Sequence, residues 1–215
     1  MASEDDRPGI RAKPPAIGYA IAEPLRALFE LVCLLPAHLV LKRAPRGDGH
    51  PVITLPGYRS DDTAMLAMRR YLERWGYAPY PWGLGANLGI GYQRIDYEKR
   101  MLEKLEKVVE KHREPATMIG WSQGGVIARE IAKQRPELVR QIIVLGSPLA
   151  DAPEATTIFR VFRRTSAEEI TSELMSFMRE VAAPMPDVRC ICIYSNSDGI
   201  VSADIAQDLV SPNVE

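Results

Sequence analysis

The chain has 215 residues, of which 46% are hydrophobic and 26% are charged, with a formal net charge of −1. This length suits one globular domain with a substantial core, and the balanced charge argues against nucleic-acid binding, which needs clustered cations. Three cysteines are too few for a disulfide framework and favour a reducing compartment, so we expect a cytoplasmic protein.

The N-terminal part is predicted to form a tail and one helix. Residues 1–15 are polar and contain prolines, which is typical of a flexible tail, and they lack the order of a signal peptide. A helical segment follows over residues 16–43, with dense apolar positions at 25–41. That stretch contains Arg26 and Glu30 and is too short for a membrane span. We expect it to pack on the body of the domain, with weak contact to a membrane surface as the alternative.

Beyond residue 50 the sequence alternates between strands and helices, within a single domain of residues 16–215. Short apolar runs predict strands at residues 52–55, 77–82, 116–120, 141–145 and 188–194. Helical spacing predicts helices at residues 64–75, 92–112 and 123–134. Apolar strands separated by helices indicate a three-layer αβα sandwich with a mostly parallel sheet. Residues 150–187 exceed a simple crossover and are predicted to form a small lid with a helix at 167–181.

The motif Gly120-Trp-Ser122-Gln-Gly124 lies between a predicted strand and a predicted helix. This is the context of a nucleophile elbow, in which a tight turn aims a serine hydroxyl away from the sheet. Side chains at positions 120 and 124 would collide across such a turn, which explains the two glycines. Ser122 is therefore the predicted nucleophile of a hydrolase, and an incidental turn is the alternative.

Two loops at carboxyl ends of strands carry further groups for acyl transfer. The backbone amides of Tyr58, after the first strand, and Gln123, after the nucleophile, fit the places of an oxyanion hole. Asp198 follows the last predicted strand, where a carboxylate can orient a histidine. Asp151, after the fourth strand, is the second choice for the acid.

A glycine-rich run follows the second predicted strand and contains Gly83, Gly85, Gly89 and Gly91. Its spacing does not match a dinucleotide-binding loop, and no acidic partner is evident. We expect a glycine-rich rim beside the active site, and we predict neither a cofactor nor a metal ion.

A serine hydrolase also needs a base, and the sequence contains only His38, His50 and His112, all before Ser122. His50 precedes the first strand and His112 precedes the third. Both are expected at the amino ends of the sheet, about 15 Å or more from the elbow. None of the three is a credible base.

From residue 44 to residue 215 the chain resembles an α/β-hydrolase family of bacterial esterases and lipases. The stretches that carry the resemblance are Ala44-Pro-Arg-Gly-Asp-Gly-His-Pro-Val, Leu55-Pro-Gly-Tyr, Trp82-Gly-Leu-Gly-Ala-Asn-Leu-Gly, Gly120-Trp-Ser-Gln-Gly-Gly, Leu145-Gly-Ser-Pro and Tyr194-Ser-Asn-Ser-Asp-Gly-Ile-Val. The resemblance implies an ester substrate, Ser122 as nucleophile, Asp198 as acid, and Tyr58 and Gln123 as oxyanion amides. Members of the family continue past the equivalent of residues 212–215 into a last strand and a Gly-Ser-His stretch that supplies the base.

Two accounts of the missing base follow. Under truncation, the fold is C-terminally incomplete and residues 188–194 form an exposed apolar edge, which favours self-association. Under the competing account, the chain is a non-catalytic hydrolase-fold protein that binds apolar or acyl ligands. An acyltransferase or thioesterase would use the same elbow and differ in the nucleophile that resolves the acyl-enzyme.

Overall fold

The computed structural model describes residues 12–89, 94–152, 155–157, 180–185, 187–208 and 210–215 of the chain. Most of the predicted tail and most of the predicted lid, including residues 167–179 of its helix, lie outside this part of the chain.

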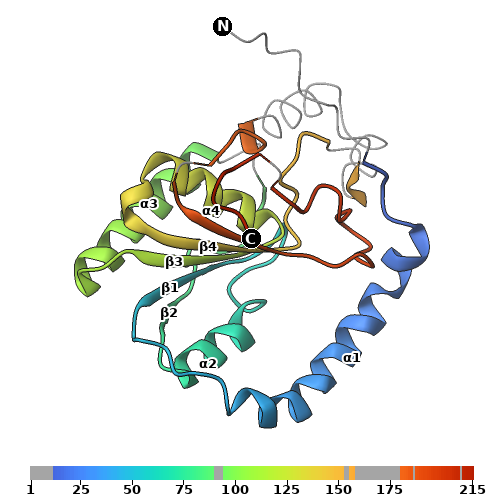
Figure 1. Ribbon diagram of the computed structural model, residues 1–215, viewed down its shortest axis with the longest axis horizontal. Coiled ribbons are helices and arrows are strands. Elements are labelled where there is room, and N and C mark those ends of the chain that lie inside the picture. The colour runs from blue at the N-terminus through green and yellow to red at the C-terminus, as the bar shows by residue number, and fades with distance from the viewer. Residues whose placement is uncertain (1–11, 90–93, 153–154, 158–179, 186, 209) are drawn as a thin grey trace, which may run out of the picture.

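A parallel sheet forms the centre of the fold (Figure 1). Its strands are β1 (Pro51–Leu55), β2 (Ala78–Tyr80), β3 (Ala116–Trp121), β4 (Val139–Leu145) and β5 (Arg189–Ile193). They lie in the order β2-β1-β3-β4-β5, and every neighbouring pair is parallel. Each predicted strand is present, with ends shifted by one or two residues. The carboxyl ends of β1, β3, β4 and β5 therefore meet along one edge, where reactive groups collect in such sheets.

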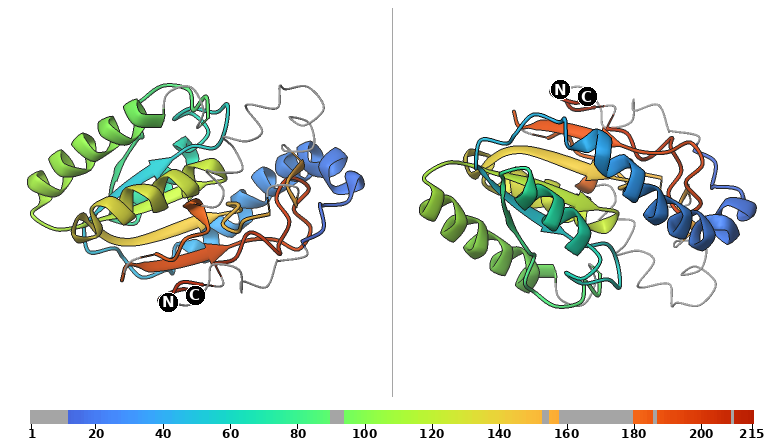
Figure 2. Two further views of the ribbon diagram at one scale, coloured as in Figure 1. Left: turned by 90° about the horizontal axis from the view of Figure 1, so that it is seen from above. Right: turned by 90° about the horizontal axis from the view of Figure 1, so that it is seen from below.

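Helices cover both faces of this sheet (Figure 2). The larger core lies under α3 (Arg94–His112) and α4 (Gln123–Gln134). In α3, Tyr97, Met101 and Leu105 recur at helical spacing and are buried against the sheet. On the opposite face α2 (Leu66–Arg74) closes a smaller core. The alternation of strand residues between these two cores confirms the three-layer αβα sandwich.

The outer edge of β5 is paired rather than open. The amides of Cys190 and Cys192 donate to the carbonyls of Asn213 and Glu215, both at 2.9 Å, and Cys190 pairs with Val214 in a parallel bridge. The prediction of a bare apolar edge is therefore wrong for the described residues of this strand. Backbone groups of residues 213–215 satisfy the hydrogen bonds that the edge would otherwise expose.

The first helix, α1 (Ile17–Leu41), stands away from the sheet as an arm along one side of the molecule (Figure 1). We expected its apolar residues to pack on the body, and this is wrong: Leu25 and Phe29 are 75% and 67% exposed. The helix is held instead through polar contacts, in which Arg26 donates to the carbonyl of Ser197 at 2.6 Å. None of the described helices is long and apolar enough to cross a bilayer.

Candidate active site

Ser122 occupies the turn between β3 and α4, with φ of 52° and ψ of −121°. A positive φ is costly for a residue with a side chain, by about 1–3 kcal/mol, and such strain persists only where the surroundings enforce it. Here the Ser122 amide donates to the carbonyl of Leu145 at 2.8 Å, and its carbonyl accepts from Gly125 at 3.0 Å. The strained turn lies at the carboxyl edge of the sheet, as a nucleophile elbow requires.

Glycines 120 and 124 flank this turn because no side chain fits at either position. A Cβ added at Gly120 would lie 2.3 Å from the Cα of Gly125, and one added at Gly124 would lie 2.3 Å from the carbonyl oxygen of Leu55. Both obstacles are backbone atoms, which cannot rotate away. The elbow thus packs directly on the end of β1, which carries the loop discussed next.

The loop after β1 lies against Ser122. A Cβ added at Gly57 would lie 3.2 Å from the Trp121 ring and 3.4 Å from the Cβ of Ser122. On the other side, Gly89 approaches both predicted oxyanion residues: its added Cβ would lie 2.9 Å from the Tyr58 ring and 3.7 Å from Nε2 of Gln123. The fold therefore brings Ser122, Tyr58, Gln123 and the glycine-rich run together.

Asn87 fastens this loop and was not singled out from the sequence. Its side chain is fully buried, donating from Nδ2 to the carbonyl of Pro56 at 2.9 Å and accepting at Oδ1 from the amide of Gly89 at 3.2 Å. Its backbone accepts from Arg59 at 2.6 Å and donates to Ser60 at 2.8 Å. Three of these four hydrogen bonds connect the glycine-rich rim to residues 56–60, and the fourth lies within the rim. The only signal in the sequence for this role of Asn87 was an asparagine among glycines, a pattern that also fits an ordinary turn.

Replacing Asn87 by leucine is expected to lower the free energy of unfolding by about 1–3 kcal/mol, because the buried carbonyl of Pro56 and amide of Gly89 lose their partner. Asn87→Asp keeps the acceptor for Gly89 but buries a carboxylate against the carbonyl oxygen of Pro56, so a loss at least as large is expected. Denaturant unfolding monitored by tryptophan fluorescence measures both. Wild-type stability of Asn87→Leu would show that this amide does not hold the loop.

Asp198 lies in the loop after β5. Its Oδ1 accepts from the amides of Ile200 and Val201 at 2.7 and 3.0 Å. Its Oδ2 lies beside Gly146, where an added Cβ would be 3.1 Å away. Gly146 directly follows Leu145, the residue that binds the Ser122 amide, so the Asp198 carboxylate and Ser122 flank the end of β4. Asp151, the second choice for the acid, is exposed to solvent.

The histidines lie at the opposite edge of the sheet. His50 is buried between Asp48 and Thr117, and Thr117 is five residues before Ser122, a distance of about 16 Å along a strand. His112 ends α3, and its Nε2 lies 2.8 Å from the hydroxyl of Tyr80. His38 lies on α1 just before Leu41, and the carbonyl of Leu41 accepts from Trp75 at the foot of α2. That none of the three serves as the base stays a prediction.

Comparison with known proteins identifies the fold. No model of a known protein family matches the chain, and no curated protein matches it. Several solved structures match the chain. An α/β hydrolase from the metagenome of sediments of the Mar Chica lagoon in Morocco is 19% identical, with a TM-score of 0.51 over 79% of this chain and 80% of that one. The chain has the α/β-hydrolase fold.

Two further solved structures share this α/β-hydrolase fold. The lipase BlEst2 of Bacillus licheniformis is 14% identical, with a TM-score of 0.55 over 80% of this chain and 84% of that one. The monoacylglycerol lipase of Paleococcus ferrophilus is 12% identical, with a TM-score of 0.53 over the same shares. At such low sequence identities, the likeness to these structures shows the fold of the chain.

Within this α/β-hydrolase fold, the described residues contain no group of three or more His, Cys, Asp or Glu side chains that could hold a metal ion. The glycine-rich run does not open a helix directly after β2. Gly83, Gly85 and Gly89 instead adopt positive φ angles of 74°, 80° and 95°, and Gly91 lies outside the described residues. The run forms an irregular wall next to Tyr58, as expected for a rim.

Proposed function

We propose that this protein is a serine hydrolase of carboxylic esters, of the esterase or lipase type, with Ser122 as its nucleophile. The observation that carries the proposal is the strained backbone of Ser122 at a strand-to-helix turn enclosed by backbone on both sides. Such strain suits a residue presented to a substrate. Two of the similar structures are lipases by name, which supports an ester as the substrate class.

In the proposed reaction, the Ser122 hydroxyl attacks the ester carbonyl while a base takes its proton. The amides of Tyr58 and Gln123 stabilise the oxyanion, the alcohol leaves with a proton from the protonated base, and water then releases the acid from acyl-Ser122. Gln123 is the first residue of α4, so the positive end of the helix dipole also faces the oxyanion. Asp198 would orient the base and stabilise its charged form.

The base must be an imidazole between Ser122 and Asp198, and none of the three histidines lies there. Residues 213–215 run parallel to β5 and therefore head toward the edge of the sheet where Ser122 and Asp198 lie. We propose that polypeptide following these residues carries the base. Without it, turnover is expected to fall by about six orders of magnitude, by analogy with removal of the histidine in subtilisin.

Free imidazole offers a direct test, because a small base can diffuse into the gap. We expect a fluorophosphonate to modify the 215-residue chain slowly, and imidazole to accelerate the reaction, as read by intact mass. Ser122→Ala should remain unmodified with and without imidazole, and Ser202→Ala, which removes a partly exposed hydroxyl outside the loop of Tyr58, should behave as wild type. An adduct that persists in Ser122→Ala would overturn the assignment of the nucleophile.

The absence of an imidazole from the position beside Asp198 favours a second candidate, a non-catalytic protein that binds apolar or acyl ligands in the same site. That protein would bind a fatty acid but form no adduct, even with imidazole present. If an adduct forms, the products obtained with an ester in the presence of water, alcohols or thiols distinguish a hydrolase from an acyltransferase.

A further inference from the structure

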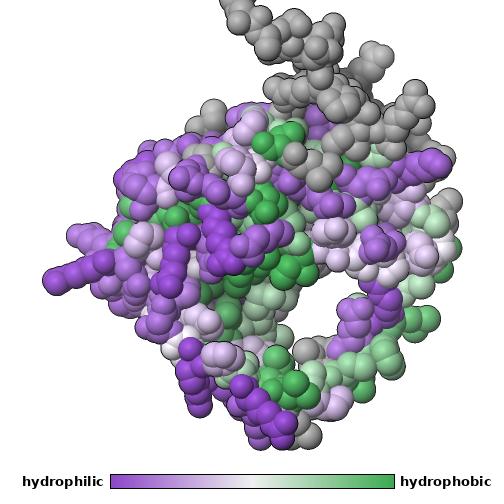
Figure 3. All heavy atoms as spheres, viewed as in Figure 1, coloured by the Kyte–Doolittle hydropathy of each residue, from purple (hydrophilic) through white to green (hydrophobic). Residues whose placement is uncertain are grey.

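The face of α1 turned away from the protein is apolar between Ile21 and Val32. Ile21, Leu25, Leu28, Phe29 and Val32 are all large, and each is more than half exposed. They recur at spacings of three and four residues and so form one continuous stripe. Figure 3 shows this: hydrophobic atoms gather along the outer side of the arm, and hydrophilic atoms face the body across an open space.

This orientation is fixed by the charged residues on the other face of the helix. Glu23 accepts from the amide of Gly199 at 2.9 Å, and Arg26 donates to the carbonyl and hydroxyl of Ser197 at 2.6 and 3.1 Å. Glu30, one turn further on, pairs with Arg26 at 3.3 Å. The loop that carries Asp198 is therefore bonded to the polar face of α1. The helix cannot roll its apolar stripe inward without breaking these bonds.

A basic cluster of Lys42, Arg43 and Arg46 follows the C-terminal end of α1, and all three residues are exposed. An uncharged stripe on a helix that is followed by clustered cations matches the boundary of an anionic bilayer, with hydrocarbon beneath the headgroups and phosphates at the surface. A second copy of this chain would bring no negative charge on its own apolar stripe to meet the cluster. From Ile21 to Val32 the stripe is about 17 Å long, which suits a helix lying in the plane of the surface.

We propose that α1 docks this protein on a lipid surface that contains anionic lipid. The apolar stripe enters the headgroup boundary, and the basic cluster contacts lipid phosphates. Docking would hold the loop of Asp198 beside the membrane, because that loop is bonded to the opposite face of α1. The proposal concerns binding and does not depend on the chemistry of Ser122.

Flotation with vesicles tests the proposal on the 215-residue chain. We expect the chain to float with vesicles of phosphatidylcholine mixed with phosphatidylglycerol, and less with phosphatidylcholine alone. Leu25→Ser combined with Phe29→Ser should reduce the partition coefficient at least about tenfold, since two large apolar side chains no longer enter the bilayer. The matched control, Leu66→Ser with Val210→Ser, removes two exposed apolar side chains elsewhere and should float as wild type.

Two further variants separate the contributions. Lys42→Gln with Arg43→Gln should remove the preference for phosphatidylglycerol and leave binding to phosphatidylcholine unchanged. Ser122→Ala should float as wild type whether or not the proposed chemistry is correct. Equal flotation of the stripe variant and the wild type would overturn the proposal. So would a wild-type dimer in sedimentation velocity that the stripe variant dissociates while flotation is unaffected, because the stripe would then belong to a second copy.

Discussion

Replacing Gly124 by alanine is expected to lower the free energy of unfolding by about 3 kcal/mol or more, at the upper end for overpacking. The added Cβ would lie 2.3 Å from the carbonyl oxygen of Leu55 and 2.7 Å from both the carbonyl carbon of Leu55 and the carbonyl oxygen of Pro56. All three atoms are backbone at the end of β1, so relief requires moving either α4 or the strand. Guanidinium unfolding followed by circular dichroism measures the loss.

The control for this substitution is Gly18→Ala in α1. A Cβ at position 18 meets nothing within 4 Å, and alanine favours helix by about 0.5–1 kcal/mol over glycine. Gly18→Ala should therefore unfold at the same denaturant concentration as wild type or slightly above it. If Gly124→Ala were as stable as Gly18→Ala, the close packing of the elbow on β1 would be refuted.

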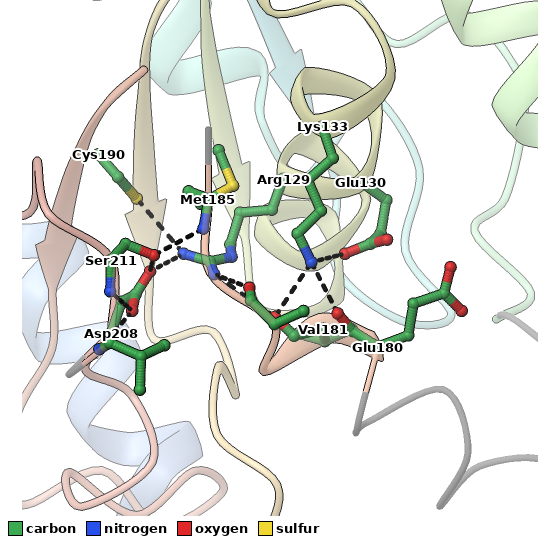
Figure 4. A network of polar contacts seen from close by, with 11 residues as sticks. Arg129, Glu130, Lys133, Glu180, Val181, Met185, Cys190, Asp208 and Ser211 are labelled. Atoms are coloured by element: carbon green, nitrogen blue, oxygen red, sulfur yellow. Dashed lines mark hydrogen bonds and ion pairs between the residues drawn. The ribbon is translucent and has the colours of Figure 1, made fainter. Parts of the chain in front are cut away.

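Replacing Arg129 by methionine is expected to cost about 3–5 kcal/mol, the range for removing one member of a buried ion pair. Arg129 lies on α4 with its side chain fully buried, and it forms an ion pair with Asp208, which is 1% exposed (Figure 4). The same guanidinium donates to the carbonyls of Val181 and Ala183, each at 3.4 Å. Methionine would leave the Asp208 carboxylate buried without its countercharge.

The ion pair also predicts how stability depends on pH. Burial alone would raise the pKa of Asp208, but hydrogen bonds from Ser211 and Arg129, together with the Arg129 charge, outweigh it and hold the pKa below its ordinary value of 3.8. Because folding lowers this pKa, the pair contributes its full stabilisation above the unfolded value. The contribution is lost as pH falls through the folded value. Arg129→Met should therefore lose less stability than wild type on acidification.

Two controls test this interpretation. Arg129→Met combined with Asp208→Asn removes both charges and keeps an acceptor for the amides of Val210 and Ser211, so it should be much closer to wild type than the single substitution. Arg189 pairs with Glu215 on the surface, where both side chains are more than half exposed, so Arg189→Met should change stability little. A single Arg129→Met variant as stable as the Arg189→Met variant would contradict the predicted cost of the buried charge.

Much of the fold was predictable because it follows from local patterns. The apolar runs gave all five strands, and α4 begins at Gln123 and ends at Gln134, as its spacing predicted. Groups that follow the carboxyl ends of parallel strands share one edge of the sheet. The sequence therefore predicted that Ser122, Tyr58 and Asp198 lie near one another. The glycines at positions 120 and 124 were understood for the same local reason.

The parts that escaped prediction depend on contacts between distant segments. Asn87 reads as a turn residue until its amide is seen against Pro56, and Arg129 reads as an exposed helix residue although it is fully buried. Composition showed that α1 has many apolar residues but did not show whether its apolar stripe faces the body of the protein or the solvent. That direction is set by Arg26 binding Ser197, 171 residues further along the chain.

The ion pair between Arg129 of α4 and Asp208 also affects when this part of the nascent chain can pack during synthesis. The guanidinium of Arg129 emerges 79 residues ahead of its carboxylate partner. At about 5–20 residues per second, a ribosome needs about 4–16 s to supply that partner. Throughout this interval the helix that starts at Gln123 carries a cation that cannot yet be paired with Asp208. The turn at Ser122 should therefore be one of the last parts of the nascent chain to become resistant to protease.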